Sequence, residues 1–392
     1  MFGKLKFKKV QKKNILEITK RCIKKIYLYS FLCVCVLLLL PFTNTFNCWM
    51  SLVPDMSFAP ISNLNIHMLD VGQGLCMAIN LPNGQNIIID TGDACSFSNV
   101  DRYIDKILLR GSRTLDYMII SHPDSDHAGN AKYILDKYQP LNVCIPKMLT
   151  ELENGSLKNY AEYYSFYNAI NINKKVNIEY NFVGKVLQID NVKFTWLGPN
   201  RDYYATSNDY STAILIEYFD FSMLFTADIG HNTGQNNKVN TEMEVMNFAS
   251  SLGIDSDIDV LQIAHHGSRY CTSIEFLEYF KPVTALISVG ENSYGHPSDE
   301  VYKNILEYDN LYNKDLISNT HITKNVNNII ISVANDSNYV VGYIENVQNY
   351  LFISFVFVDL LFLAVALYKL LDYILGYIEL RKKNSIYYND KL

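Results

Sequence analysis

Residues 121–130, SHPDSDHAGN, place His122, Asp124, Asp126 and His127 within a stretch of six positions. Imidazole nitrogens and carboxylate oxygens are common protein ligands for divalent ions such as Zn²⁺, Mn²⁺ and Mg²⁺. The stretch follows the apolar run YMII, which is typical of a buried strand. We therefore predict a metal-binding loop at a strand end, and the alternative interpretation is a surface turn capped by aspartates.

Three other apolar runs end on side chains of the same kind. NIII is followed by Asp90, MLFTA by Asp228 and VLQIA by His265. In layered α/β folds, the ends of strands line the crevice where the sheet opens. We therefore expect these side chains to meet the loop at 121–130 around one metal centre.

The segments between these side chains alternate between two kinds of pattern. LNIHMLDV and LCMAINL read as β-strands, whereas NVDRYIDKILLR and TEMEVMNFASSLG read as helices. NIIISV and YVVGYI predict a closing hairpin. Strands mixed with helices predict an α/β domain built in layers, which we place at residues 62–345.

The charge of the chain is unevenly distributed. The 392 residues carry a formal net charge of −6, although residues 1–25 hold ten Lys or Arg and the single acidic residue Glu17. The centre of the chain is therefore strongly acidic. This argues against a broad electrostatic contact with a nucleic-acid backbone, which needs clustered Lys and Arg.

Two apolar segments predict membrane helices on either side of the domain. Residues 26–45 contain the run IYLYSFLCVCVLLLLPF, and residues 350–371 form a second run that includes Asp359. A spanning helix needs about 20 mostly apolar residues. The alternatives are a cleaved signal peptide for the first segment and an amphipathic interfacial helix for the second.

Basic residues orient both predicted helices. Residues 1–25 precede the first helix and RKK follows the second, so the positive-inside tendency places a basic segment and a tail at 372–392 in the cytoplasm. The domain between the helices would then lie outside the cytoplasm. A carboxylate within a spanning helix usually faces water or a partner. The sequence does not identify a protein partner for Asp359.

Taken in order, the motifs resemble those of a known family. SHPDSDHAGN is similar to the H-x-[HD]-x-D-H loop of the metallo-β-lactamase superfamily. LDVGQGL, IIIDTG, LFTAD, AHHGS and YGHP resemble the hydrolase domain of ComEC-type DNA-uptake proteins, over about residues 64–345. The resemblance implies a four-layer αβ/βα sandwich with a metal centre at its open edge. Because the DNA channel of those proteins needs many membrane helices, we expect only the hydrolase part here.

The resemblance also implies the residues that bind metal. They are His122, Asp124, Asp126, His127, Asp228 and His265, with Asp228 shared between two ions. Asp90 would orient a ligand by hydrogen bonding. A further His of many family members is replaced here by SNDYS, in which Asn208 and Ser211 are the polar candidates. We expect one or two divalent ions, Zn²⁺ or Mn²⁺, with Mg²⁺ as an alternative favoured by oxygen ligands.

The implied reaction is metal-dependent hydrolysis, because a bound divalent ion lowers the pKa of water to about 7. The favoured substrate is a phosphodiester, in the concrete form of an oligonucleotide or single-stranded DNA. We assign catalysis to Asp126 and His296, with His296 protonating the leaving oxygen or holding a phosphate. His266, Ser268 and Arg269 are predicted to contact phosphate oxygens.

Two other functions stay open. The missing His and the acidic charge favour a non-catalytic module that is tethered to the membrane and binds a metal or a partner. The same centre also supports hydrolysis of esters, thioesters or lactams. The sequence has no G-x-S-x-G motif and no complete G-x-G-x-x-G motif, which argues against a serine hydrolase and a dinucleotide-binding loop.

Overall fold

The computed structural model describes residues 62–344, apart from 110–113, 148–159, 174, 203, 232–237 and 255–256, together with a few residues within 24–28 and 365–379. The chain divides into two compact units, Met1–Pro54 with Asn346–Leu392, and Asp55–Glu345. Most of the predicted membrane segments, 26–45 and 350–371, and Asp359 fall outside the described residues. Within the described part of the chain, no helix is long and apolar enough to cross a bilayer.

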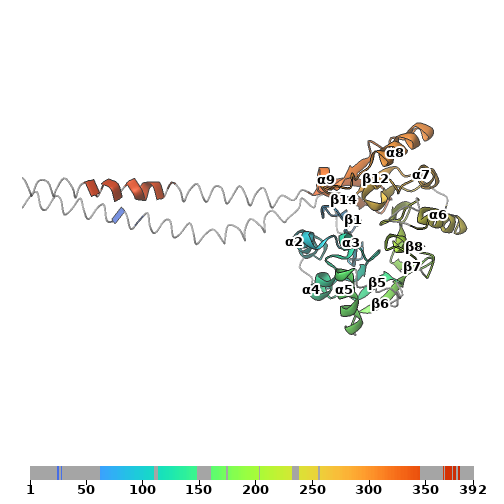
Figure 1. Ribbon diagram of the computed structural model, residues 1–392, viewed down its shortest axis with the longest axis horizontal. Helices are drawn as coiled ribbons and strands as arrows, with labels where there is room; N and C mark the ends of the chain where they lie inside the picture. The colour runs from blue at the N-terminus through green and yellow to red at the C-terminus, as the bar shows by residue number, and fades with distance from the viewer. Residues whose placement is uncertain are drawn as a thin grey trace, which may run out of the picture. The chain divides into compact units, whose positions relative to one another are not determined.

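Two β-sheets form the centre of the Asp55–Glu345 unit (Figure 1). Among the described residues, the first sheet has eight strands in the order β15-β14-β1-β2-β3-β4-β5-β6, and the second has seven in the order β13-β12-β11-β10-β9-β8-β7. The strands of the first sheet are β1 (Leu64–Met68), β2 (Met77–Asn80), β3 (Asn86–Ile89), β4 (Tyr117–Ile119), β5 (Asn142–Pro146), β6 (Asn177–Asn181), β14 (Asn328–Val333) and β15 (Tyr339–Ile344). Those of the second are β7 (Val186–Ile189), β8 (Val192–Gly198), β9 (Ala213–Tyr218), β10 (Phe221–Phe225), β11 (Val260–Gln262), β12 (Thr284–Ile287) and β13 (Thr320–Ile322).

Each sheet is antiparallel on one side and parallel on the other. In the first sheet, the pairs from β15 to β3 are antiparallel and those from β3 to β6 are parallel. In the second sheet, the pairs from β7 to β10 are antiparallel and those from β10 to β13 are parallel. Because parallel neighbours point the same way, the carboxyl ends of β3 and β4 lie at one edge, and so do those of β10 and β11.

Helices cover the outer face of each sheet (Figure 1). The first sheet packs against α2 (Phe97–Tyr103), α4 (Ala131–Tyr138) and α5 (Ala161–Ile172). The second packs against α6 (Thr241–Ser251), α7 (Ile274–Phe280) and α8 (Asp299–Tyr312). Two shorter helices, α3 (Ser125–Ala128) and α9 (Thr323–Val326), occupy loops.

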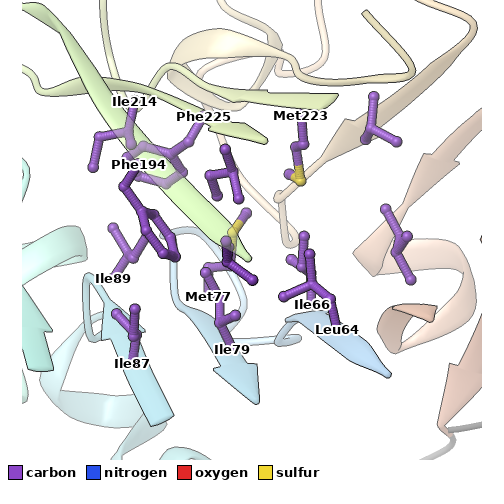
Figure 2. Close-up of a cluster of buried hydrophobic side chains, with 14 of the residues drawn as sticks. Leu64, Ile66, Met77, Ile79, Ile87, Ile89, Phe194, Ile214, Met223 and Phe225 are labelled. Carbon is purple, nitrogen blue, oxygen red and sulfur yellow. The ribbon is translucent and has the colours of Figure 1, made fainter. Parts of the chain in front are cut away.

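The main apolar core lies between the two sheets. Leu64, Ile66, Met77, Ile79, Ile87 and Ile89 of the first sheet face Phe194, Ile214, Met223 and Phe225 of the second (Figure 2). Alternate residues of the same strands point outward, where two further clusters pack beneath the helices. Two sheets enclosed by helices confirm the predicted α/β layered fold.

Three strands, β5, β6 and β13, were not predicted. β5 (NVCIP) lies inside the first sheet, but its buried run is short and ends at Pro146. β6 has the sequence NIEYN and β13 the sequence THI, and both contain polar, partly exposed side chains. Both strands form the edge of their sheet. An edge strand is covered less completely than a central one, so it lacks the apolar pattern by which the central strands are identified.

Candidate metal centre

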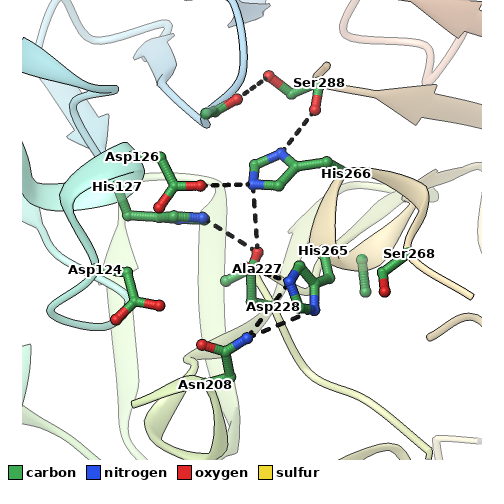
Figure 3. Close-up of polar contacts among 12 residues, drawn as sticks. Asp124, Asp126, His127, Asn208, Ala227, Asp228, His265, His266, Ser268 and Ser288 are labelled. Carbon is green, nitrogen blue, oxygen red and sulfur yellow. Dashed lines mark hydrogen bonds and ion pairs between the residues drawn. The ribbon is translucent and has the colours of Figure 1, made fainter. Parts of the chain in front are cut away.

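Loops at the carboxyl ends of four strands bring the predicted side chains together. Figure 3 shows those that follow β4, β10 and β11. Asp90 follows β3, His122 lies just beyond β4, Asp228 follows β10 and His265 follows β11. All four residues are buried. The parallel pairing of β3 with β4 and of β10 with β11 explains why segments distant in sequence meet here.

The loop at 121–130 does not behave as a capped surface turn. Asp124 occupies the N-cap position of α3, but its carboxylate makes no cap hydrogen bond. Its Oδ1 atom is buried and has no hydrogen-bond partner. The alternative interpretation of this loop is therefore not supported.

His127 is held between two carboxylates. Its Nδ1 atom lies 2.7 Å from Oδ2 of Asp90, and its Nε2 atom lies 3.1 Å from Oδ1 of Asp228. Asp90 also accepts hydrogen bonds from the backbone N–H and the hydroxyl of Ser121, at 2.7 and 2.6 Å. Burial by itself would lower the pKa of His127, but Asp228 and Asp90 raise this pKa well above its ordinary value.

The two oxygens of Asp228 face different histidines. Oδ2 lies 3.9 Å from Nε2 of His122 and 3.5 Å from Nε2 of His265. Oδ1 lies 3.1 Å from Nε2 of His127 and 4.0 Å from Nε2 of His266. Burial would raise the pKa of Asp228, but His127, His265 and His266 hold it well below its ordinary value. Asp228 therefore occupies the position expected of a carboxylate shared between two cation positions.

His266 contacts Asp126, which the sequence did not indicate. Its Nε2 atom is 3.2 Å from Oδ2 of Asp126, while its Nδ1–H donates to the carbonyl of Ser288 at 2.8 Å. Ligand atoms of Asp126, His127 and His266 lie within 4.8 Å of one another, as do those of a second group, His122, His127 and Asp228. His266, which was predicted to contact phosphate, therefore stands among the residues that could hold a cation.

The separation of His265 from His266 has a backbone cause. Both residues adopt left-handed backbone conformations, with φ of 48° and 56°. This conformation is rare for residues with a side chain, and it directs the two consecutive rings to different oxygens of Asp228. The motif AHHGS reveals no such turn, so the sequence did not place His266 at a cation position beside His265.

The unbonded polar atoms of the site fit a divalent cation. Nε2 of His122, Nε2 of His127, Oδ1 of Asp124 and Oδ1 of Asp228 are buried and make no hydrogen bond, although the His127 and Asp228 atoms form an ion pair with each other at 3.1 Å. Leaving a buried polar atom unpaired costs about 1–3 kcal/mol. Four such atoms in one place, all of ligand type, are what a metal site requires.

The stretch SNDYS lies against the same centre. Asn208 Nδ2 is 3.5 Å from both ring nitrogens of His265, and Ser211 Oγ accepts the backbone N–H of Asp228 at 3.2 Å. Asp209, which the sequence analysis did not single out, accepts the backbone N–H of Lys238 at 2.9 Å and the hydroxyl of Thr206 at 2.7 Å. The stretch thus supports the centre but brings no imidazole to it.

A cleft of about 1230 Å³ opens over the centre. Its lining includes Asp124, Asp126, Asp228, His265, His266, Ser268, Arg269 and His296. The His296 ring lies 5.7 Å from that of His265, and burial together with His265 and His266 lowers the pKa of His296 to about 4. The predicted phosphate contacts therefore share one cleft with four of the six predicted ligands, Asp124, Asp126, Asp228 and His265.

Three supporting residues were missed by the sequence analysis. Ser121 donates to Asp90, and Ser288 orients His266 through its carbonyl. Gln262 accepts the backbone N–H groups of Thr226 and Ala227, both at 2.8 Å, just before Asp228. Each of them follows or ends an apolar strand, and that position is the one signal that could have identified them.

Comparison with known proteins agrees with this geometry. The chain matches the metallo-β-lactamase superfamily over residues 69–290, and it belongs to that superfamily. It is 28% identical to ComE operon protein 3 of Bacillus subtilis (strain 168) over 303 residues, which cover 73% of this chain and 34% of that protein. It is 30% identical to Recombination protein 2 of Haemophilus influenzae over 263 residues, which cover 67% and 28% of the two chains.

The predicted resemblance to competence proteins of the ComEC type is thus confirmed, although the chain spans only about a third of the length of these relatives. Competence protein ComA of Neisseria gonorrhoeae is 24% identical over 280 residues, or 70% of this chain and 35% of that protein. Among solved structures, the metallo-β-lactamase fold protein YhfI of Bacillus subtilis aligns with a TM-score of 0.43 at 11% identity, covering 71% of this chain and 100% of that one.

Proposed function

We propose that the protein is a metal-dependent phosphodiesterase that hydrolyses DNA or oligonucleotides. The observation that carries this proposal is the set of buried, unbonded ligand atoms beside an open cleft. The cleft exceeds the roughly 300–1,000 Å³ of most small-molecule sites, which favours an extended substrate. The names of two relatives refer to competence and recombination, and this supports a nucleic acid as the substrate.

The proposed ligands form two positions on either side of Asp228. His122 and His265 face its Oδ2 atom, with Asp124 3.6 Å from His122. His127 and His266 face its Oδ1 atom, and Asp126 contacts His266. One or two divalent ions, Zn²⁺ or Mn²⁺ with Mg²⁺ as the alternative, would fit these positions. A bound ion would make water more acidic and place positive charge beside the phosphoryl oxygens.

The remaining cleft residues would handle the substrate. His296 would protonate the leaving oxygen or hold a phosphate oxygen, and its pKa of about 4 favours the second role near neutral pH. Ser268 and Arg269 would contact further phosphate oxygens. Asp90 keeps the His127 ring in the orientation that leaves Nε2 free for a ligand bond. Replacing His296 with Ala should slow turnover strongly while metal content and fold are retained.

The test is a panel of substrates and metals on the full chain. Wild type and Asp126→Ala are loaded with Mn²⁺, Zn²⁺ or Mg²⁺ and offered a single-stranded oligonucleotide, bis(p-nitrophenyl) phosphate, an aryl ester, a thioester and a β-lactam. We expect cleavage of the phosphodiesters by wild type and none by the variant. Turnover of an ester, thioester or lactam alone would contradict the proposed substrate class.

A non-catalytic module is the second candidate, and Asn208 favours it because an amide lies where many family members place a ligating His. In that case mass spectrometry would find stoichiometric metal on the wild-type chain, without turnover of any substrate in the panel. Metal bound together with phosphodiester cleavage would exclude this candidate.

We also propose that residues 26–45 and 350–371 attach the protein to a lipid bilayer, with the hydrolase domain outside the cytoplasm. The support is the apolar character of both segments and their basic flanks. Protease added to intact cells should then cleave the domain, and the tail at 372–392 should stay protected. A domain that is protected in intact cells and cleaved only after lysis would contradict this orientation.

A further inference from the structure

An exposed aromatic ring lies beside the candidate metal centre. Tyr294 is 73% exposed, although it lines the same cleft as Asp126, Asp228 and His266. Among the exposed large hydrophobic side chains that the structure describes, only Ile172 is more exposed. Scattered exposed apolar residues are ordinary on a surface, but a ring at the wall of a hydrolytic cleft is placed where a substrate would pass.

The backbone around Tyr294 is held in place by one side chain. Asn292 Oδ1 accepts the backbone N–H groups of Tyr294 and His296, at 3.1 and 3.0 Å. Asn292 Nδ2 donates to the carbonyls of Gly290 and His296, at 2.9 and 2.8 Å. The loop is therefore fixed by four hydrogen bonds, so Tyr294 is presented to solvent by a structured turn.

The ring of Tyr294 has one aromatic neighbour among the described residues. Its centroid lies 5.7 Å from that of His296, with an angle of 33° between the planes. The two rings are tilted against each other, and the high exposure of Tyr294 leaves most of its ring open to solvent. A planar ligand group could stack there without displacing any side chain.

The charge of the cleft indicates why such a surface would be needed. Asp93 and Glu291 line the cleft in addition to the proposed carboxylate ligands, whereas Arg269 is the one Lys or Arg among the described lining residues. The cleft walls thus give a polyanion little electrostatic attraction away from the metal positions. Stacking on an aromatic ring does not depend on charge, and it is the other common way in which proteins hold single-stranded nucleic acid.

We propose that the open face of Tyr294 is a nucleobase-binding subsite. An unpaired base of the substrate stacks on this ring while a neighbouring phosphate lies at the metal centre. The subsite rests on the proposed phosphodiesterase function and adds a preference for single strands, because a paired base is already stacked within its duplex. Tyr294 would thereby distinguish a nucleic acid from a phosphodiester without bases.

The test compares two oligonucleotides that differ only in their bases. Oligothymidylate and an abasic oligonucleotide of equal length are offered to the full chain as wild type, Tyr294→Ala and Tyr294→Phe. Loss of one stacking contact should raise KM for oligothymidylate about tenfold in Tyr294→Ala, with kcat unchanged. KM for the abasic strand should stay unchanged, and Tyr294→Phe should behave as wild type because the ring is retained.

A matched control is Tyr312→Ala. Tyr312 is also partly exposed and lies 5.4 Å from another ring, that of Tyr308. Tyr312 is the last residue of α8. Ser298, which lines the cleft, caps the opposite end of that helix. Tyr312→Ala should therefore leave both KM values unchanged.

Two results would overturn the subsite. An equal rise in KM for both strands in Tyr294→Ala would show that Tyr294 acts through His296, and no rise for either would show that the ring does not contact substrate. If wild type cleaves neither strand, the proposed phosphodiesterase function is contradicted, and the subsite must be tested by binding. Binding of both strands, followed by fluorescence anisotropy with a chelator present, then decides the subsite: tighter binding of oligothymidylate must disappear in Tyr294→Ala.

Discussion

The Nδ1 atom of His127 lies 2.7 Å from Oδ2 of Asp90, and this contact directs Nε2 of the same ring toward Asp228. Two hydrogen bonds from Ser121 keep the Asp90 carboxylate from turning away. Asp90 therefore determines both the tautomer and the direction of a proposed ligand, although it contributes no ligand atom in this arrangement.

Asp90→Asn should weaken metal binding about 10–100-fold without removing a ligand. The amide of Asn can accept the Ser121 N–H, but its NH₂ group then faces Nδ1 of His127 and places the ring proton on Nε2. Competition for Zn²⁺ with a chromophoric chelator measures the effect. Asp101→Asn is the control, since Asp101 contacts Lys137 and Tyr138 instead. Equal Zn²⁺ affinities for Asp90→Asn and wild type would contradict this role.

His265→Ala and His266→Ala should each impair a different metal position, because the two rings face different oxygens of Asp228. We expect two binding steps in a Mn²⁺ or Zn²⁺ titration of wild type and the loss of one step in each variant. Calorimetry with metal analysis by mass spectrometry measures this. Two unchanged steps in His265→Ala would show that His265 is not a ligand.

Asn208→His should strengthen the metal position on the Oδ2 side of Asp228. Asn208 Nδ2 already lies 3.5 Å from the ring nitrogens of His265, so an imidazole at position 208 would lie beside the same metal position as His265. We expect an increase of about tenfold in Zn²⁺ affinity for that position, or ~1.4 kcal/mol. Asn208→Gln retains an amide and is the control. A Zn²⁺ affinity no higher than that of the Gln variant would refute the prediction.

The sequence was sufficient to predict the layered fold and the strand ends that carry Asp90, His122, Asp228 and His265. Long apolar runs that end on polar side chains are a strong local signal, and the parallel pairing of their strands brings those ends together. The edge strands β6 and β13 gave no such signal, because partial exposure relaxes the apolar pattern.

The sequence assigned His266 to phosphate contact and did not reveal that it faces a cation position, because the directions of His265 and His266 are set by their left-handed backbone. It also could not reveal Gln262 or Ser288, whose contacts to the centre run through backbone atoms. The Ser288 carbonyl places no constraint on residue type, and the backbone N–H groups that the Gln262 side chain binds leave no partner residue type to recognise in the sequence. The position of each residue at the end of an apolar strand was therefore the one signal that the sequence offered.

Glu242 should make the stability of the domain depend on pH. It is fully buried on α6, where its carboxylate accepts hydrogen bonds from the backbone of Thr272 and Ser273 and from the Ser273 hydroxyl. Burial raises the pKa of Glu242 to about 7 despite these donors. The folded state thus holds its proton at pH values where the unfolded chain has already lost it.

The free energy of unfolding should accordingly fall as pH rises from about 4.5 to about 7, by about 3 kcal/mol from this group, and then level off. Urea unfolding of wild type and Glu242→Gln at a series of pH values measures this contribution as the difference between the two profiles. Glu300→Gln changes an exposed position on α8, so its free energy of unfolding should depend on pH as that of wild type does. Parallel profiles for wild type and Glu242→Gln would contradict the prediction.

Gly290→Ala should damage the support of the metal centre through a backbone clash. A Cβ atom at Gly290 would meet the backbone of Gly72 and lie 2.6 Å from the backbone N of Gln73. That loop continues to Gly74, whose carbonyl accepts the Ser288 hydroxyl at 2.7 Å, and to Leu75, whose N–H donates to the Asp126 carbonyl at 3.0 Å. Displacing the loop therefore shifts the backbone beside both Asp126 and His266.

We expect Gly290→Ala to lower the free energy of unfolding by about 1–3 kcal/mol, the usual cost of overpacking, and to weaken Zn²⁺ binding as well. Gly198→Ala is the matched control, since its Cβ would meet only Val245 at 3.4 Å and Ala213 at 4.0 Å, which are ordinary contacts. Urea unfolding followed by Zn²⁺ titration of the folded variant measures both effects. Gly290→Ala could instead be destabilised and still bind Zn²⁺ as wild type does. The strain would then have relaxed without moving Asp126 or His266, and the loop from Gly72 to Leu75 would support the fold and not the metal centre.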